Sequence, residues 1–286
     1  MAEKENQAAL PAGLYLVATP IGHAADITLR ALDLLTRADG LAAEDTRRTR
    51  TLLDLHAVPL AGRRIEAYHD HNAAAQRPRL LARIAAGEAL VYVSDAGTPL
   101  VADPGYRLAA EAIAAGMRVV AAPGASALLA ALTVAGLPTD RFFFAGFPPV
   151  KSGARARFLT ECAAVPSTLV FYESPHRLGE SLAAMRIAFG DRPAAVCREL
   201  TKKFEETVRA PLSELALRYA AGPPKGESVV VVGPPEAVEA SAEDLDQALR
   251  TALLHASVRD AAAEVAARLG VPRKRAYARA LSLERD

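Results

Sequence analysis

The sequence predicts an α/β fold of two αβ domains followed by a small helical region. Short apolar runs typical of strands alternate with amphipathic helical windows from Gly13 to Gly233. Strand candidates in the first half are continuously apolar, which is typical of a mainly parallel sheet covered on both faces. Residues 236–286 carry no strand pattern, so the chain is expected to end in helices.

The first αβ domain is expected over residues 13–137, after a flexible N-terminus at 1–12. Its strand candidates are 13–18, 41–44, 65–68, 89–94 and 118–122. Helices are expected at 27–37, 46–55, after Asn72, at 104–115 and after Gly124. Asp26 is placed to cap the first of these helices. Pro104, preceded by Asp103, is placed at the first position of the fourth.

The second αβ domain is expected over residues 138–235. Its strand candidates are 167–172, 194–198, 205–209 and 228–233, and its helix candidates are 155–164, 175–189 and 212–221. Some of the connections are too short to hold a crossover helix. This sheet is therefore predicted to have more antiparallel character than the first.

The tail, residues 236–286, reads as three helices at 242–255, 258–269 and 272–283. Gly270 ends one helix and Pro272 opens the next, a pattern typical of a helix-turn-helix. Arg273, Lys274 and Arg275 place positive charge at the start of the last helix. Two interpretations stay open: a helical cap with solvated charges, or a nucleic-acid contact.

Composition excludes several classes of protein. Hydrophobic residues make up 51% and charged residues 23%, which excludes global disorder. Thirty-four Lys and Arg against 33 Asp and Glu give a net charge of +1, so any nucleic-acid role depends on local patches of positive charge.

Cys162 and Cys197 fit neither a disulfide framework nor a metal motif, which favours a reduced, cytoplasmic setting. The first ten residues lack the apolar stretch of a secretory signal. The uncharged stretch 119–139 is broken by Pro and Gly and is expected inside the fold, with no membrane span.

Four predicted strands end in short turns, most of them rich in glycine and proline. These turns lie at 19–22, 94–99, 123–126 and 171–174. Ligands of open α/β folds bind beyond the carboxyl ends of parallel strands. Glycine and alanine let the backbone approach a ligand closely. Because the phosphate loop of nucleotide hydrolases and the Gly-x-Gly-x-x-Gly turn are both missing, we expect a ligand held by backbone contacts rather than a triphosphate on Mg²⁺.

Charged candidates cluster at 44–48, 69–72, 173–177 and 198–202. An extended segment would put His69 and His71 on one face, but a third metal ligand at sensible spacing is missing, so no metal is expected. Substrate contact or loop hydrogen bonding is the alternative for these histidines. Arg198 and Glu199 could equally form a buried ion pair at a domain seam. Arg47, Arg48, Lys151 and Lys202 are candidates for an anionic groove, with solvated helix faces as the rival interpretation.

Several ordered motifs carry a resemblance to a known family. They are LYLVATPIG at 14–22, AEDTR at 43–47, HDHN at 69–72, VSDAGTPL at 93–100, DPG at 103–105, GLPTDRF at 136–142, FYES at 171–174 and RELTK at 198–202. The chain resembles the family of ribosomal RNA small subunit methyltransferase I, in the tetrapyrrole methylase-like class of S-adenosylmethionine enzymes. The resemblance runs from Gly13 to the C-terminus.

The resemblance implies a homodimer of two-domain αβ subunits with S-adenosylmethionine in the cleft between the domains. It implies methylation of the ribose 2′-hydroxyl of a cytidine in the decoding region of 16S rRNA, in the small ribosomal subunit. The implied cofactor-binding residues are Pro20, Asp95, Ala96, Gly97, Thr98, Asp103, Pro123, Gly124, Ala125, Ser126, Tyr172 and Arg198. This chain has His23 and Ala125-Ser126 where the family commonly has Asn and Pro-Cys.

Methyl transfer from a sulfonium to a hydroxyl needs alignment, exclusion of water and help in deprotonating the hydroxyl. Asp45, His69, His71 and Glu173 are the candidate bases or orienting residues. Arg47, Arg48, Lys151, Lys202, Arg273, Lys274 and Arg275 are the candidate RNA-binding residues. Two rival interpretations remain. A tetrapyrrole or other small-molecule methyltransferase predicts a cleft without a basic rim, and a non-catalytic RNA-binding protein predicts degenerate cofactor turns.

Overall fold

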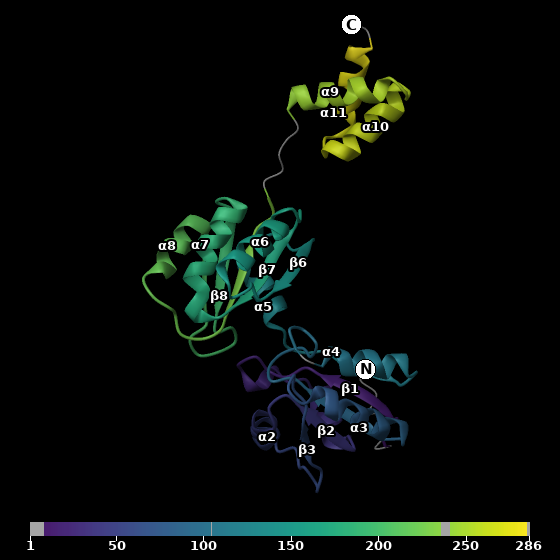
Figure 1. Cartoon of the computed structure of the whole chain (residues 1–286), viewed down its shortest axis with the longest axis vertical. Helices are drawn as coiled ribbons and strands as arrows, with labels where there is room; N and C mark the ends of the chain where they lie inside the picture. Colours follow the sequence, from purple (N-terminus) through teal and green to yellow (C-terminus); the bar gives the residue numbers. More distant parts are fainter. Residues whose placement is uncertain (1–8, 104, 236–240, 285–286) are drawn as a thin grey trace. The chain divides into compact units, whose positions relative to one another are not determined.

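The computed structural model describes residues 9–103, 105–235 and 241–284 (Figure 1). The chain divides into two compact units, one ending at Pro235 and the other beginning at Glu236. The first unit holds two sheets of five strands each, which we call the first and second lobes. None of the described helices combines the length and apolar character that a membrane crossing requires.

The first lobe is a parallel sheet with strand order β3-β2-β4-β1-β5. Its strands are β1 (Gly13–Val17), β2 (Gly40–Ala43), β3 (Ile65–Ala67), β4 (Ala89–Val93) and β5 (Val119–Ala122). Its helices are α1 (Leu29–Arg37), α2 (Thr46–Leu55), α3 (Ala73–Ala85) and α4 (Tyr106–Ala114). Parallel strands need crossover connections, and these helices provide them.

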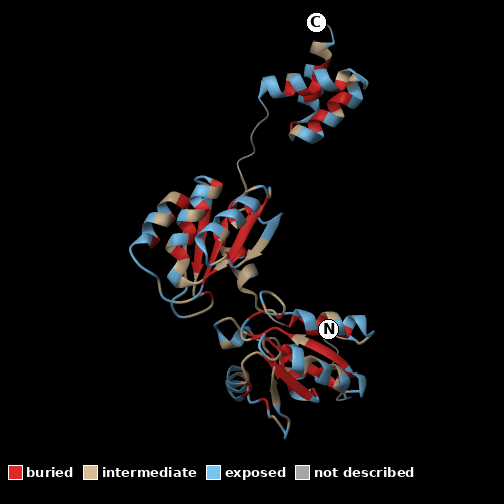
Figure 2. Ribbon diagram, in the orientation of Figure 1, coloured by how far each residue is buried: buried red, intermediate tan, exposed pale blue. Residues whose placement is uncertain are grey.

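Both faces of this sheet are covered, as Figure 2 shows by the buried strands at its centre. Along β4, Val91 and Val93 pack into a core with α1 and α2. The alternate residues Leu90 and Tyr92 pack into a second core with α3 and α4. Successive side chains of a strand point to opposite faces, so a continuously apolar strand requires helices on both sides.

The second lobe is a mixed sheet with order β6-β7-β10-β8-β9, in which β6 and β7 are parallel and the other pairs antiparallel. Its strands are β6 (Phe142–Gly146), β7 (Thr168–Glu173), β8 (Pro193–Arg198), β9 (Glu206–Pro211) and β10 (Ser228–Val232). Helices α6 (Ser152–Ala163), α7 (Leu178–Phe189) and α8 (Leu212–Ala220) cover one face. The predicted antiparallel character is confirmed.

Helix α5 (Ala127–Ala135) connects the two lobes. It follows β5 of the first sheet in the chain, yet Ala131, Leu132 and Ala135 pack against the second sheet. Ser126 caps its start, and Gly136, in the left-handed conformation at φ 71°, ends it. The chain therefore passes from one lobe to the other through the turn at 123–126.

Two sequence expectations differ from the structure, and two others fall on residues that the structure does not describe. Asp26 does not cap α1, because it lies in a short 3₁₀ turn (Ala24–Asp26), and Thr28 accepts the capping hydrogen bond from the Ala31 N–H instead. Residues 142–146, expected only as a boundary, form the edge strand β6. Pro104, predicted at the first position of a helix, lies outside the described residues, and helix α4 begins at Tyr106. Most of the predicted flexible N-terminus also lies outside the described residues.

The second unit contains helices α9 (Ala242–Leu253), α10 (Val258–Leu269) and α11 (Arg273–Leu283). Ser241 and Asp244 form a capping box, and Ser257 caps α10. Gly270 adopts the left-handed conformation that ends α10, and Pro272 precedes the first residue of α11. The three helices share a core of their own, which includes Leu249, Val265 and Ala276.

Candidate active site

The carboxyl ends of β1, β2 and β4 bring three turns together at one edge of the first sheet. The Thr19 and Gly97 backbones exchange two N–H···O hydrogen bonds of 3.0 Å, which tie the turn after β1 to the turn after β4. The Ser94 hydroxyl donates to the Gly97 carbonyl at 2.9 Å. Gly97 has φ +79°, a conformation that disfavours any residue with a Cβ, so a glycine is required at this junction.

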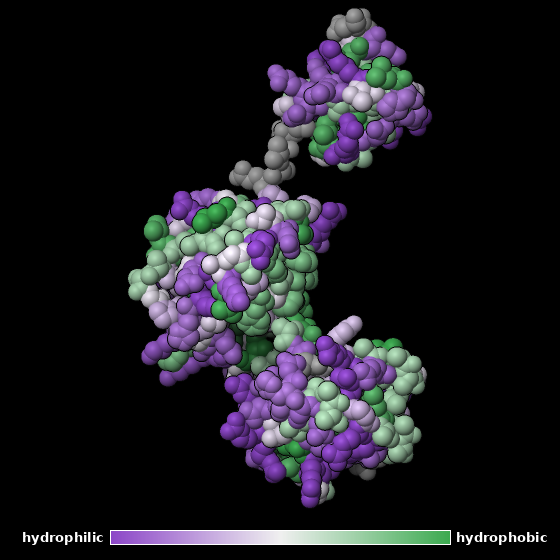
Figure 3. All heavy atoms as spheres, in the orientation of Figure 1, coloured by the Kyte–Doolittle hydropathy of each residue, from purple (hydrophilic) through white to green (hydrophobic). Residues whose placement is uncertain are grey.

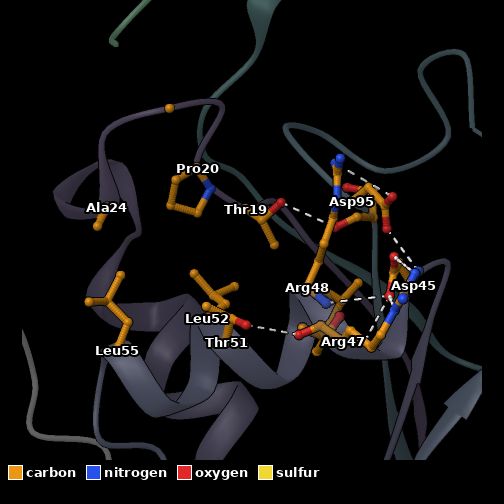
Figure 4. Close-up of a pocket in the computed structure, with 14 residues that line it drawn as sticks. Thr19, Pro20, Ala24, Asp45, Arg47, Arg48, Thr51, Leu52, Leu55 and Asp95 are labelled. Carbon is orange, nitrogen blue, oxygen red and sulfur yellow. Dashed lines mark hydrogen bonds and ion pairs between the residues drawn. The ribbon is translucent and has the colours of Figure 1, made fainter. Parts of the chain in front are cut away.

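A first cavity, of about 570 Å³, opens on one side of these joined turns. Figure 4 shows Pro20, Ala24, Leu52 and Leu55 on one side of it, and Asp45, Arg47, Arg48 and Asp95 on the other. Helix α2 supplies both arginines and both leucines. The cavity thus has an apolar half and a charged half.

Asp45 and Asp95 are linked through the backbone at the start of α2. The Asp45 carboxylate accepts hydrogen bonds from the N–H groups of Arg47 (2.8 Å) and Arg48 (3.4 Å), and so caps the helix. The Asp95 carboxylate accepts from the Asp45 N–H at 2.8 Å. The Arg47 N–H, followed by its guanidinium, lowers the pKa of the Asp45 carboxyl. Asp45 is therefore held in its ionised form.

Glu44 lies beside this network and was not among the predicted site residues. Burial raises the pKa of its carboxyl, and the nearby carboxylates of Asp95, Asp103 and Asp70 raise it further, against the opposing charge of Arg48. The signal in the sequence was the acidic pair at the end of β2. Asp45, the second member of that pair, caps α2, whereas Glu44, the first, is the one whose pKa is raised by burial.

A second cavity, of about 370 Å³, lies on the other side of the joined turns. The first lobe contributes small residues from its turns, among them Ala96, Gly97 and Thr98. The second lobe contributes Tyr172, Cys197, Leu200 and Val229 from the ends of its strands. Among the described residues, the two cavities share no lining residue, so the joined turns form a partition between them.

Hydrogen bonds link the turns and strand ends around the second cavity. The Thr98 hydroxyl donates to the Ala125 carbonyl at 3.0 Å, and the Leu128 N–H at the start of α5 donates to the Tyr172 hydroxyl at 3.2 Å. The His23 N–H donates to the Thr201 hydroxyl at 3.0 Å. His23 also uses Nδ1 to cap the turn that follows it, so this departure from the family pattern has a structural role.

The predicted cofactor residues fall into three groups. Five line the second cavity: Ala96, Gly97, Thr98, Ser126 and Tyr172. Pro20 and Asp95 line the first cavity. The remainder, Asp103, Pro123, Gly124, Ala125 and Arg198, are not among the described residues that line either one. The apolar lining from Cys197, Leu200 and Val229 was not predicted, because buried apolar residues carry no chemical signal in a sequence.

Two of these residues are held in structural contacts. The Asp103 carboxylate accepts hydrogen bonds from the Tyr92 hydroxyl and the Gly105 N–H, both at 2.7 Å. Arg198 donates twice to the Glu206 carboxylate, at 3.0 and 2.7 Å, and to the Lys225 carbonyl. The predicted pairing of Arg198 with Glu199 is wrong, because Arg198 pairs with Glu206 on the neighbouring strand and Glu199 pairs with Lys202. Lys202 pairs with Glu199 and Glu227, each at 2.9 Å, at the second cavity.

The four candidate bases do not meet at one point. Asp45 lines the first cavity and Glu173 the second, whereas His69 and His71 are not among the described residues lining either. Glu173 is fully buried, and its carboxylate binds Arg177, the Ser174 N–H and the Ser181 hydroxyl. This carboxylate has its hydrogen bonds satisfied within the fold, which favours a structural role over proton transfer. The described residues contain no cluster of three His, Cys, Asp or Glu side chains suited to a metal.

The predicted RNA-binding residues are exposed or partly exposed and lie on both units. Arg47 and Arg48 border the first cavity, and Lys151 precedes α6 on the second lobe. Arg273, Lys274 and Arg275 form the exposed first turn of α11 in the second unit. The nearby Arg279 pairs with Asp246 of α9, so the basic character of this unit centres on the start of α11.

Known proteins are similar to this chain over almost its whole length. Residues 13–216 match the family described as Tetrapyrrole (Corrin/Porphyrin) Methylases, and residues 239–284 match the RsmI C-terminal HTH domain. The ribosomal RNA small subunit methyltransferase I of Mesorhizobium japonicum is 52% identical over 96% of this chain and 93% of its own. The protein of the same name from Escherichia coli O157:H7 is 45% identical over 94% of both chains.

Solved structures share the fold at low sequence identity. A conserved hypothetical protein from Aeropyrum pernix K1 aligns with a TM-score of 0.62 and 21% identity, over 79% of this chain and 86% of its own. Uroporphyrin-III C-methyltransferase from Thermus thermophilus, described as complexed with S-adenyl homocysteine, aligns with a TM-score of 0.54 and 24% identity, over 77% of this chain and 97% of its own. The family match and the near-complete overlap with its sequence relatives show the family. The chain belongs to the ribosomal RNA small subunit methyltransferase I family, within the tetrapyrrole methylases.

Proposed function

We propose that the second cavity binds S-adenosylmethionine. Its volume, about 370 Å³, lies within the range of about 300–1,000 Å³ usual for ligand pockets. The supporting observation is its two-sided lining, in which glycine- and alanine-rich turns face apolar strand ends. Such turns let backbone groups reach a polar ligand, and the strand ends offer a surface for a purine.

The lining residues fit such a ligand chemically. Burial raises the pKa of the Cys197 thiol to about 11, so this side chain stays neutral and presents an apolar surface. Tyr172 and Phe147 line the same cavity with ring centroids 5.5 Å apart. Aromatic rings stack on nucleobases and also stabilise cations at their faces. S-adenosylmethionine carries both a nucleobase and a positively charged sulfonium.

S-adenosylmethionine, when bound, supplies an electrophilic methyl group. The lobes of the chain then have to hold the acceptor in line with that group and keep water out, which lowers the barrier by positioning. The hydrogen bonds of Thr98 with Ala125 and of Leu128 with Tyr172 fix the walls against each other. Asp45 lines the cavity on the other side of the partition. We propose that the acceptor ribose lies at the partition, where the Asp45 carboxylate accepts the hydroxyl proton.

The proposed acceptor is the ribose 2′-hydroxyl of a cytidine in the decoding region of 16S rRNA, within the small ribosomal subunit. Membership of the family supports rRNA as the substrate. Arg47 and Arg48 give the first cavity the basic rim that a small-molecule methyltransferase would not require. The exposed basic turn of α11 offers a second contact for phosphates. An rRNA substrate would place the reaction in the cytoplasm.

A homodimer is the proposed assembly. Strand β6 lies at the edge of the second sheet, and Phe142 and Phe143 on it are 43% and 42% exposed. In the view of Figure 3, hydrophobic residues cover much of the second lobe, whereas the visible face of the first lobe is mainly hydrophilic. Exposed edge strands with apolar side chains pair readily with a second chain, which makes this surface the candidate for the dimer contact.

The cofactor proposal can be tested by filling the second cavity. Ala96 is exposed and lines it, so Ala96→Trp adds bulk there without disturbing a core. We expect this variant to bind S-adenosylhomocysteine at least about tenfold more weakly in calorimetry, a loss of ~1.4 kcal/mol. Ala75→Trp, on the exposed face of α3, is the matched control and should bind as the wild type does. Equal binding by both variants would refute the assignment.

A further inference from the structure

The first cavity has no assigned ligand in the proposed reaction beyond the phosphate contacts of its two arginines. At about 570 Å³ it is larger than the second cavity. Its walls come from the turns after β1, β2 and β4 and from the length of α2. A cavity at the carboxyl ends of parallel strands is where α/β folds bind ligands.

Its apolar half is suited to a flat, uncharged group. Leu55, in the last turn of α2, is 63% exposed and lines the cavity instead of entering the core. Pro20, Ala24 and Leu52 complete this half, as Figure 4 shows. A nucleobase that lies on such residues loses water from one face and gains contact area.

The charged half is suited to a phosphate. The Arg47 side chain is 91% exposed and touches Asp45 at 3.4 Å, while Arg48 lies 3.7 Å from Asp95 and is 63% exposed. Both contacts are long for an ion pair, and a guanidinium has five N–H donors. The two carboxylates accept backbone N–H groups, so the outer donors of both arginines remain available to an anion.

A base-sized apolar surface next to two arginines matches one unit of a nucleic acid. We propose that the first cavity is a nucleotide subsite, in which the base lies on Pro20, Leu52 and Leu55 and the arginines bind the adjoining phosphates. The proposal rests on the proposed function, since it assumes an RNA substrate. It adds where one particular nucleotide of that RNA is held.

The partition indicates which nucleotide this is. The turns after β1 and β4, joined by the Thr19–Gly97 hydrogen bonds, separate the first cavity from the proposed cofactor cavity. The ribose that receives the methyl group has to face the cofactor. The nucleotide in the first cavity is therefore a direct neighbour of the methylated one, and it fixes the register of the RNA.

Steady-state kinetics on small ribosomal subunits that lack the methyl mark test this subsite. Leu55→Ala and Arg47→Ala should each raise the KM for subunits about tenfold, which corresponds to ~1.4 kcal/mol. The kcat of Leu55→Ala, and the affinity of both variants for S-adenosylhomocysteine, should stay within about twofold of the wild-type values. The matched controls are Leu217→Ala, an exposed leucine of α8, and Arg50→Ala, an exposed arginine of α2 outside the lining.

Cavity variants that behave like their controls would overturn the subsite while leaving the methyltransferase assignment intact. A wild-type protein that methylates no subunit would overturn the proposed function and the subsite with it. A photo-crosslinking residue at position 55 gives an independent reading. The expected crosslink is to a nucleotide directly flanking the methylated one. A crosslink to a ribosomal protein, or to distant rRNA, would overturn the subsite.

Discussion

Asp45 illustrates how one side chain can serve the backbone and the site together. It caps α2 and lines the first cavity. Asn and Asp cap helices almost equally well, so Asp45→Asn removes the charge and keeps the cap. This substitution therefore separates a chemical role from a structural one.

We expect Asp45→Asn to lower kcat by about 10²–10⁴-fold, the usual contribution of a general base, with little change in Tm. The measurement is methyl transfer at saturating S-adenosylmethionine and saturating subunits, with thermal melting alongside. A variant with unchanged kcat would show that Asp45 only orients α2. The base would then have to be sought elsewhere, beginning with Glu44.

Glu44 leads to a second prediction, about stability. Its pKa is raised in the folded protein above the ordinary value of 4.5, so the folded state holds this proton more tightly than the unfolded chain does. As the pH rises above 4.5, the ionised carboxylate therefore lowers the free energy of unfolding. Glu44→Gln removes that cost.

We expect Glu44→Gln to raise Tm at pH 7, with the gain over the wild type shrinking as the pH falls towards 4.5. Melting curves across this pH range provide the measurement, and Glu161→Gln, at an exposed position of α6, is the control. A gain that does not depend on pH, or a lower Tm at pH 7, would contradict the electrostatic explanation.

At the scale of elements, the contact between α7 and α8 depends on one glycine. A Cβ at Gly179 would lie 2.5 Å from the Tyr219 carbonyl oxygen of α8. The obstacle is backbone, which cannot rotate away. Gly179→Ala should therefore lower the free energy of unfolding by about 1–3 kcal/mol, the usual cost of overpacking.

Gly153→Ala is the matched control, because Gly153 also lies near the start of a helix and has nothing within 4 Å of its added Cβ. That variant should gain roughly 0.5–1 kcal/mol from better helix propensity. Thermal or denaturant unfolding measures both changes. Two substitutions that shift stability in the same direction would refute the steric argument.

Most elements could be predicted from local patterns, and the exceptions have tertiary causes. Continuous apolar runs predict β1, β4 and β10. The helical periodicity of apolar residues, together with capping residues, predicts the three helices of the tail. Strand β6 was not predicted, because its three consecutive phenylalanines do not alternate with polar residues as in a typical half-buried strand. These phenylalanines are partly exposed at the edge of the sheet. Thr28 was missed as a cap because a 3₁₀ turn precedes it. That α5 packs on the second sheet depends on long-range contacts, which no local pattern encodes.

At the scale of the whole molecule, the candidate site consists of the joined turns after β1 and β4, with one cavity on each side of them. The sequence motifs include both turns, and five of the residues predicted to bind the cofactor line one cavity. They could not show that Pro20 and Asp95 face the other one, because neighbouring residues of a turn point in opposite directions. The tail adds a unit with its own core and a basic first turn on α11.

The central claim is that this chain transfers a methyl group to one ribose of the small-subunit rRNA. The most direct measurement incubates the protein with isotopically labelled S-adenosylmethionine and small subunits that lack the mark, followed by mass spectrometry of the digested 16S rRNA. We predict a single labelled 2′-O-methylcytidine in the decoding region. Label on a base, label in another RNA, or unlabelled rRNA from a protein that binds the cofactor would contradict the account.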